Sequence, residues 1–360
     1  MKVMTILGTR PEIIRLSRLI PHLDQSCEHV LVHTGQNFDP TLSDNVFRDL
    51  QVRAPDAYMG VGAAANFGEQ IAQVIAKTHE LLASHRPDRL LVLGDTNSAL
   101  SAIVAKRLGI PVFHMETGNR CYDDRVPEEV NRRIIDHCSD VLMPYTERSR
   151  QNLLREGIDS NRIFVTGNPI NEVIGHYAAA ISAAPAPATL ALEEGRFFLV
   201  TMHRAENVDR RERLTKLGEA MAQLAARYGL PVVISTHPRT RERLQSFGLA
   251  TDAPNVRFLE PFGFFDFVAL EKKALCVLTD SGTVQEECCL LKVHNITIRD
   301  TTERPETIEC GSNILTGVEP TSIMQGVEMA LRVAPAWTPP PEYLAEHVSA
   351  TAARIVLGHH

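Results

Sequence analysis

The fold of this chain can be predicted from the stretch LLVLGDT at residues 90–96. Four apolar residues that end at a glycine are typical of a buried strand in a parallel sheet. A second such run at residues 110–113 leads to Glu116. Because ligands of open α/β sheets bind at the carboxyl ends of the strands, we expect Asp95 and Glu116 to face one crevice. Glu128 follows closely enough to reach it from the next loop or helix start. Several carboxylates around one pocket suit proton transfer.

Length and composition restrict the class of protein. At 360 residues the chain exceeds what one core usually holds, so we expect two domains. The net charge of −7 argues against a general nucleic-acid partner. No apolar stretch reaches the ~18 residues that a membrane span needs. Residues 1–7 read as a first strand rather than a signal peptide, so we expect no membrane partner.

Cysteine usage indicates the compartment. The chain has seven cysteines, an odd number, and no Cys-x-x-Cys. This argues against a disulfide framework and against a zinc ribbon, and it favours a reducing cytoplasm.

Strand-like and helix-like segments alternate along the chain, which predicts an α/β fold with mainly parallel sheets. The alternation stops after Tyr177, where Ala and Pro dominate, and restarts near Phe197. We therefore expect a first domain at 1–177, a linker at 178–195 and a second domain at 196–334. We expect 335–360 to be a Pro-rich spacer and a helix that packs back on the first domain.

Two strand-to-helix turns are candidates for holding phosphate. Arg10 stands in the first turn, where Pro11 suits the first helical position, although a purely structural turn is an equal alternative. Ser281, Gly282 and Thr283 begin a helix in the second half, where glycine lets the backbone approach a ligand. Glu286 and Glu287 follow at a reach suited to sugar hydroxyls. The alternative is a helix capped by Asp or Ser with acids in its first turn.

A His-Arg pair follows the first strand of the second half. His203 and Arg204 stand where they can grip a diphosphate, and His237 occupies a similar place after the next strand. Phe267 belongs to an aromatic cluster at 262–267, most of which we expect in the core. One ring of this cluster could stack on a base.

Taken together, these segments resemble the non-hydrolysing UDP-N-acetylglucosamine 2-epimerase family over nearly the whole chain. The matching segments are Gly8–Glu12, Gly94–Thr96, His114–Gly118, Pro127–Arg132, His203-Arg204, Asp280–Glu287 and Arg299–Glu306. The resemblance implies two Rossmann-like domains facing a cleft that holds UDP, in the GT-B arrangement. It also implies a homodimer.

The resemblance implies roles for single residues. Catalytic roles fall on Asp95, Glu116, Glu128 and His203. It also implies that Arg10, Arg132, Phe267, Ser281 and Glu287 contact the substrate. We add Arg204, His237, Gly282 and Thr283 as candidate contacts, because they follow strand ends or begin a helix. The implied reaction is anti elimination of UDP to a 2-acetamidoglucal followed by re-addition of UDP on the other face, with no NAD and no metal.

Two departures from the family pattern bear on regulation and substrate. Residues 35–39 read GQNFD, where members activated by their own substrate carry Gln-His-Arg-Glu-Met, and Arg15 stands where lysine is common. Residues 118–121 read GNRC, which most resembles capsule and O-antigen enzymes that make UDP-N-acetyl-L-fucosamine from its 6-deoxy-talose epimer. A related enzyme acts on UDP-diacetamido-glucuronate. The alternatives are a GT-B glycosyltransferase, a hydrolysing 2-epimerase and a UDP-sugar sensor.

Overall fold

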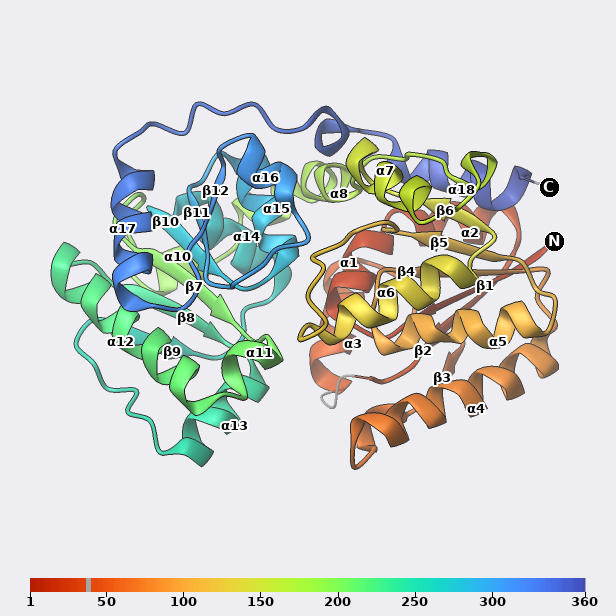
Figure 1. Ribbon diagram of the computed structural model, residues 1–360, viewed down its shortest axis with the longest axis horizontal. Helices are drawn as coiled ribbons and strands as arrows, with labels where there is room; N and C mark the ends of the chain where they lie inside the picture. The colour runs from red at the N-terminus through yellow and green to blue at the C-terminus, as the bar shows by residue number, and fades with distance from the viewer. Residues whose placement is uncertain (37–39, 360) are drawn as a thin grey trace. The chain divides into compact units, whose positions relative to one another are not determined.

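The computed structural model describes residues 1–36 and 40–359 and divides into two compact units (Figure 1). The first unit comprises Met1–His176 and Pro341–His360, and the second comprises Tyr177–Pro340. Each unit is described by itself. Within the described residues, no helix has the length and apolar character needed to cross a membrane.

The first unit is built on a parallel six-stranded sheet with the order β3-β2-β1-β4-β5-β6. Its strands are β1 (Lys2–Leu7), β2 (Glu28–His33), β3 (Ala57–Tyr58), β4 (Arg89–Leu93), β5 (Val112–Met115) and β6 (Val141–Met143). After β6 the chain adds only a single bridge, from Ile163 to Leu142.

Helices cover both faces of this sheet. They are α1 (Arg10–Leu16), α2 (Leu19–Ser26), α3 (Pro40–Asp49), α4 (Phe67–His85), α5 (Ser101–Arg107), α6 (Pro127–Cys138), α7 (Glu147–Arg155), α8 (Ile170–His176) and α18 (Val348–Gly358), with 3-10 turns at Val61–Ala63, Asn97–Leu100, Ser160–Arg162 and Pro341–Leu344. Successive strand residues such as Val3 and Met4 are both fully buried, as strands covered on both faces must be. One face packs on α4, α5 and α6.

The second unit repeats this design with the sheet order β12-β11-β10-β7-β8-β9, also parallel. Its strands are β7 (Phe198–Met202), β8 (Val232–Thr236), β9 (Val256–Leu259), β10 (Cys276–Thr279), β11 (Asn295–Thr297) and β12 (Asn313–Leu315). Its helices are α9 (Ala178–Ser182), α10 (Ala186–Thr189), α11 (Ala205–Val208), α12 (Arg211–Tyr228), α13 (Pro238–Phe247), α14 (Phe264–Lys273), α15 (Gly282–Leu291), α16 (Pro305–Glu309) and α17 (Pro320–Leu331). One face packs mainly on α12 and α17, and the other on α14 and α15.

One connecting segment is more ordered than its composition indicates. Instead of an open linker at 178–195, the short helices α9 and α10 pack on α14, and the Ala186 amide donates to Asp266 at 2.9 Å. The C-terminal helix α18 packs on α2, and Arg89 donates to the Val356 carbonyl. Ala-rich helices this short gain their stability from such packing rather than from propensity.

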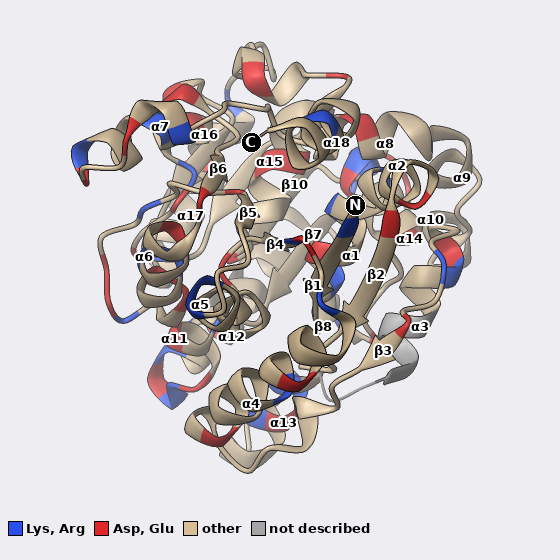
Figure 2. Ribbon diagram, turned by 90° about the vertical axis from the view of Figure 1, so that its right-hand side faces the viewer, with Lys and Arg blue, Asp and Glu red and all other residues tan. Residues whose placement is uncertain are grey.

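Both sheets have the doubly wound Rossmann order, so the expected α/β class is confirmed. In each sheet the strand order reverses at one point, between β1 and β4 in the first unit and between β7 and β10 in the second. Ligands of such sheets bind at this point, outside the carboxyl ends of the strands. Charged residues gather on helices and loops, whereas the strands are largely uncharged (Figure 2).

Candidate functional site

Asp95 lies where the first sheet reverses, two residues beyond β4. Its Oδ2 accepts hydrogen bonds from Nε and Nη2 of Arg132, at 3.1 and 2.7 Å. Asn131, the neighbour of Arg132 on α6, donates to the Asp95 carbonyl at 3.0 Å. Arg132 is almost fully buried and also bonds the buried Glu129 at 2.6 Å. Helix α6 therefore holds a partly exposed carboxylate in a fixed position.

Glu116 follows the neighbouring strand β5 and has an equivalent arrangement. Its carboxylate pairs with the buried Arg15 of α1, and the Tyr145 hydroxyl donates to the same oxygen at 3.4 Å. A Cβ placed on Gly94 would lie 3.7 Å from this oxygen, so Glu116 packs beside the loop that carries Asp95. Glu116 has a φ of 63°, a left-handed conformation that costs about 1–3 kcal/mol and is common at functional sites.

The structure also places Glu128 and Arg10 on this side of the first unit. Glu128 is the second residue of α6 and lies one helical turn before Arg132, so both occupy the same face. Arg10 is the first residue of α1, directly after the β1 loop. Burial lowers the pKa of Arg10, against the charge of Asp49.

Glu12 is a buried acid at this edge that we did not identify from the sequence. It accepts hydrogen bonds from the Gly8 amide at 3.0 Å, the Thr9 hydroxyl at 2.7 Å and the Thr96 hydroxyl at 3.1 Å. Burial raises the pKa of Glu12 to about 7, although these hydrogen bonds lower it. Glu12 thus joins the β1 loop to the loop that carries Asp95. The spacing of Thr9 and Glu12, typical of a capping box, could have indicated that Glu12 bonds to this turn.

His114 belongs to the core beneath the site. Its Nε2 lies 2.7 Å from the Gly94 carbonyl, and its Nδ1 lies 3.2 Å from Asp136. Asp136 also pairs with Arg120 at 2.8 Å, and all three side chains are fully buried. Burial would raise the pKa of Asp136, but the His114 hydrogen bond and the Arg120 charge outweigh it and lower that pKa. This network supports the loops on both sides of Glu116.

In the second unit, the fully buried Asp280 fixes the loop after β7. It accepts from the amides of His203 and Arg204 at 3.0 Å and from the Asn207 side chain at 3.2 Å. Asp280 therefore does not cap α15, which was one interpretation of the sequence. It holds the His-Arg pair at the point where the second sheet reverses.

His203 and His237 lie together at this edge. Their ring centroids are 5.5 Å apart, and the His203 side chain is 32% exposed. His237 also caps α13, because its Nδ1 accepts the Arg239 amide at 3.2 Å. Arg204 extends toward Glu303, at 3.8 Å.

Helix α15 begins with the glycine-containing turn expected from the sequence. Ser281 is the N-cap residue, yet its hydroxyl makes no capping bond to the helix. A Cβ on Gly282 would lie 2.6 Å from a carboxylate oxygen of Glu303, so a larger residue there requires the Glu303 side chain to move. Thr283 is half-buried in the first turn. Exposed amides at a helix start favour an anionic ligand.

The two acids in α15 have different surroundings. Glu286 is fully buried and forms an ion pair with Arg304. Glu287 is 4% exposed and lies on the α14 side of the helix. Phe267 of α14 packs, partly buried, on the same core face.

Arg299 forms a second buried network that we did not predict. It donates to Glu303 at 2.9 Å, and its Nε lies 3.1 Å from Glu206. Burial raises the pKa of Glu206, although Arg299 opposes the shift. The Arg-x-x-x-Glu spacing of residues 299–303 gave no indication of this, because the segment is a loop.

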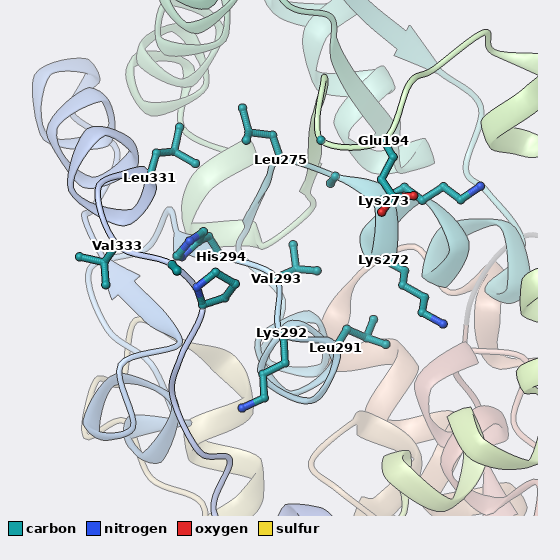
Figure 3. A pocket seen from close by; sticks show the side chains of 14 residues that line it. Glu194, Lys272, Lys273, Leu275, Leu291, Lys292, Val293, His294, Leu331 and Val333 are labelled. Atoms are coloured by element: carbon teal, nitrogen blue, oxygen red, sulfur yellow. The ribbon is translucent and has the colours of Figure 1, made fainter.

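A cavity of about 370 Å³ lies elsewhere in the second unit (Figure 3). Its lining includes Gly195, Leu275 and His294, which precede β7, β10 and β11. The cavity is therefore at the amino ends of the strands, away from the His-Arg pair. Of the stretch that departs from the pattern of substrate-activated members, residues 37–39 lie outside the described residues.

Comparisons with known proteins find similar sequences and structures along nearly the whole chain. The family model described as UDP-N-acetylglucosamine 2-epimerase matches residues 22–356. A UDP-N-acetylglucosamine 2-epimerase of Methanocaldococcus jannaschii is 40% identical over 348 residues, which cover 94% of this chain and 95% of that protein. A UDP-2,3-diacetamido-2,3-dideoxy-D-glucuronate 2-epimerase of Pseudomonas aeruginosa is 34% identical over 336 residues, 92% of each chain.

A solved structure is also similar along the whole chain. The crystal structure of the Methanocaldococcus jannaschii UDP-GlcNAc 2-epimerase, in complex with UDP-GlcNAc and UDP, has a TM-score of 0.94 at 38% identity. The match covers 99% of both chains.

Proposed function

Because the chain belongs to the UDP-N-acetylglucosamine 2-epimerase family and is therefore an epimerase, we propose that it inverts C2 of a UDP-N-acetylhexosamine without net hydrolysis. One observation carries this proposal: Asp95 and Glu116 follow neighbouring strands, and each is held by a buried arginine. Binding of UDP-GlcNAc and UDP by the solved relative supports a UDP-sugar as substrate.

The chemistry must solve one problem, since the C2 proton of an amino sugar is not acidic. We propose that anti elimination breaks the C2–H bond and the C1–O bond together, which releases UDP and leaves a 2-acetamidoglucal. Re-addition of UDP to C1, with protonation of C2 from the opposite face, completes the inversion. Asp95, Glu116 and Glu128 are the proposed acid and base groups.

The departing diphosphate needs positive partners. We assign this task to His203, Arg204 and the start of α15 at Ser281–Thr283. Arg10 and Arg132 of the first unit remain candidate substrate contacts. Fixed positive groups at a developing charge are commonly worth about 3–4 kcal/mol each. Glu287 is the proposed partner of the ribose hydroxyls, and Phe267 and His237 complete the nucleotide contacts.

The proposal is tested by incubating the protein with a panel of UDP-sugars in deuterated water and following C2 by NMR. We expect the 2-epimer and deuterium at C2 with no acceptor present, together with traces of released glucal. A requirement for an acceptor would indicate a glycosyltransferase. Free UDP that accumulates in step with free sugar would indicate a hydrolysing epimerase, and binding without turnover would indicate a sensor.

The same panel of UDP-sugars identifies which sugar is the substrate. We propose UDP-GlcNAc and UDP-ManNAc as the basic pair, with UDP-2-acetamido-2,6-dideoxy-L-talose and UDP-N-acetyl-L-fucosamine as the finer assignment, for surface polysaccharide precursors. The relative from Pseudomonas aeruginosa supports variation at C6. We also propose a homodimer, which light scattering after gel filtration tests directly.

A further inference from the structure

Two cysteines of the second unit lie in contact on neighbouring helices. Cys289 belongs to α15, and Cys310 is the residue that ends α16. Their sulfur atoms are 3.7 Å apart, and both residues are free thiols. Cys288 belongs to the core on the sheet side of α15, so Cys289 is the cysteine that faces α16. Cysteines that point apart cannot be bridged without backbone movement, whereas these two point at each other.

The surroundings give the two thiols different reactivity. Cys310 is half-buried, and its sulfur also lies 3.4 Å from the Ser312 hydroxyl. The hydrogen bond from Cys289 lowers the pKa of Cys310 most, with burial opposing it and Ser312 adding to it. The same bond, followed by burial, raises the pKa of the fully buried Cys289. Because the thiolate is the form that reacts with oxidants, Cys310 is the sulfur that reacts first.

Other cysteines of the chain provide a comparison. Cys276 and Cys288 are fully buried, and burial raises the pKa of both thiols. Cys27 and Cys138 are half-buried like Cys310, but burial raises the pKa of each. Within the described part of the chain, neither of these two contacts a second cysteine sulfur. Exposure alone therefore does not make them equivalent to Cys310.

We propose that Cys289 and Cys310 form a redox-sensitive site, in which a hydroperoxide converts the two thiols reversibly into an intramolecular disulfide. The Cys310 thiolate attacks one peroxide oxygen, so that an S–O bond forms, the O–O bond breaks, and the hydroxide that leaves is protonated to water. The Cys289 sulfur then attacks the Cys310 sulfur, the S–O bond breaks, and hydroxide leaves with the Cys289 proton as water. The sulfur atoms lose the electron pair that the peroxide gains, and a dithiol reverses the change.

The disulfide would fix both ends of α16 on α15. At the start of α16, Arg304 forms an ion pair with Glu286, which lies one helical turn before Cys289. A bond at Cys310 adds a covalent link at the other end of the same short helix. A cross-link of this kind restricts the unfolded chain and thereby stabilises the folded protein. This consequence does not depend on the proposed function.

The test treats the full chain at low protein concentration with hydrogen peroxide and identifies the state of each cysteine by mass spectrometry. We expect linked peptides that contain Cys289 and Cys310, with one hydrogen lost from each sulfur, and dithiothreitol should restore both thiols. Cys27 and Cys138 should still react with N-ethylmaleimide after the same treatment. A disulfide between two chains, or oxidation of Cys310 no faster than that of Cys27, would overturn the proposal.

Variants separate the two steps of the reaction. Cys289→Ala should stop the reaction at the sulfenic acid of Cys310, which dimedone traps. Cys310→Ser should leave Cys289 reduced, because its thiol is buried. Cys27→Ser is the matched control and should form the disulfide as wild-type protein does. If dimedone does not label Cys310 in Cys289→Ala, Cys310 is not the residue that reacts with peroxide and the proposed site is wrong.

Thermal denaturation measures the restraint that the disulfide imposes. Oxidised wild-type protein should have a Tm about 5 °C or more above that of the reduced protein, because the cross-link restricts the unfolded chain. The same peroxide treatment of Cys310→Ser should leave its Tm unchanged. If the disulfide forms and Tm does not rise, the bond does not hold α16 on α15, and that part of the proposal is wrong.

Discussion

The carboxyl edges of the two sheets arise from the same strand order but present different groups. In the first unit, Asp95 has a partly exposed carboxylate, the Glu116 side chain is 8% exposed, and each is held by a buried arginine. In the second unit the strand-end acid, Asp280, is fully buried, and it holds His203 and Arg204 at the edge instead. The strand order fixes which loops lie together at each edge. Within each pair of side chains at the edge, one partner is buried, and the other decides which charge the edge presents to a ligand. We infer that the first edge moves protons and the second binds an anion.

The largest effect should come from removing the proton-transfer groups. Asp95→Asn, Glu116→Gln or Glu128→Gln should each lower kcat by at least ~10²-fold, because amides cannot exchange a proton with C2. UDP should bind to each variant as to wild type. Steady-state kinetics and calorimetry measure both quantities. Asp124→Asn, in an exposed loop before α6, is the control that should change neither. Near-normal turnover in all three variants would refute the catalytic assignment.

Arg204→Gln tests the edge of the second sheet, where we expect a change in UDP binding rather than in proton transfer. We expect it to raise the Kd for UDP by about tenfold, because a charge-assisted contact to the diphosphate is lost. Calorimetry with UDP alone isolates binding from chemistry. Arg196→Gln is a matched control, since Arg196 precedes the same strand β7 at its other end and is largely exposed. Equal effects of the two variants would indicate only a general loss of positive charge.

The positions of Asp95 and Glu116 could be predicted from the sequence, because they depend only on where parallel strands end. Apolar runs that end at Gly94 and Glu116 located two neighbouring strand ends, and parallel pairing brought them together. The partners that fix each charge were not predictable. Glu12 and Arg299 have partners that only tertiary packing brings to them. For the same reason the segment 178–195 resembles a linker in composition, yet folds onto α14.

Gly282→Ala tests how tightly the second edge is packed. The added methyl would lie 2.6 Å from Glu303, which Arg299 holds in place. We expect a loss of about 1–3 kcal/mol in the free energy of unfolding, together with weaker UDP binding, as is usual for overpacking. Gly218→Ala in α12 has open space at its Cβ and should stabilise by about 0.5–1 kcal/mol. Urea denaturation measures both variants, and equal changes would contradict the close packing.

Glu12 should make the stability of the first unit depend on pH. Its pKa rises from the usual 4.5 to about 7 on folding, so the unfolded state loses its proton first. The stabilising contribution of the protonated side chain is fully present below pH 4.5 and is lost as the pH rises to about 7. Relative to Glu12→Gln, wild-type protein should lose on the order of 1 kcal/mol between pH 6 and 8. Denaturation at several pH values measures the difference.

Glu69→Gln, in the exposed first turn of α4, is the control and should leave the wild-type curve unchanged. If the Glu12→Gln curve instead follows wild type, the hydrogen bonds from Thr9, Gly8 and Thr96 outweigh burial, and Glu12 stays ionised as a fixed anion beside Asp95.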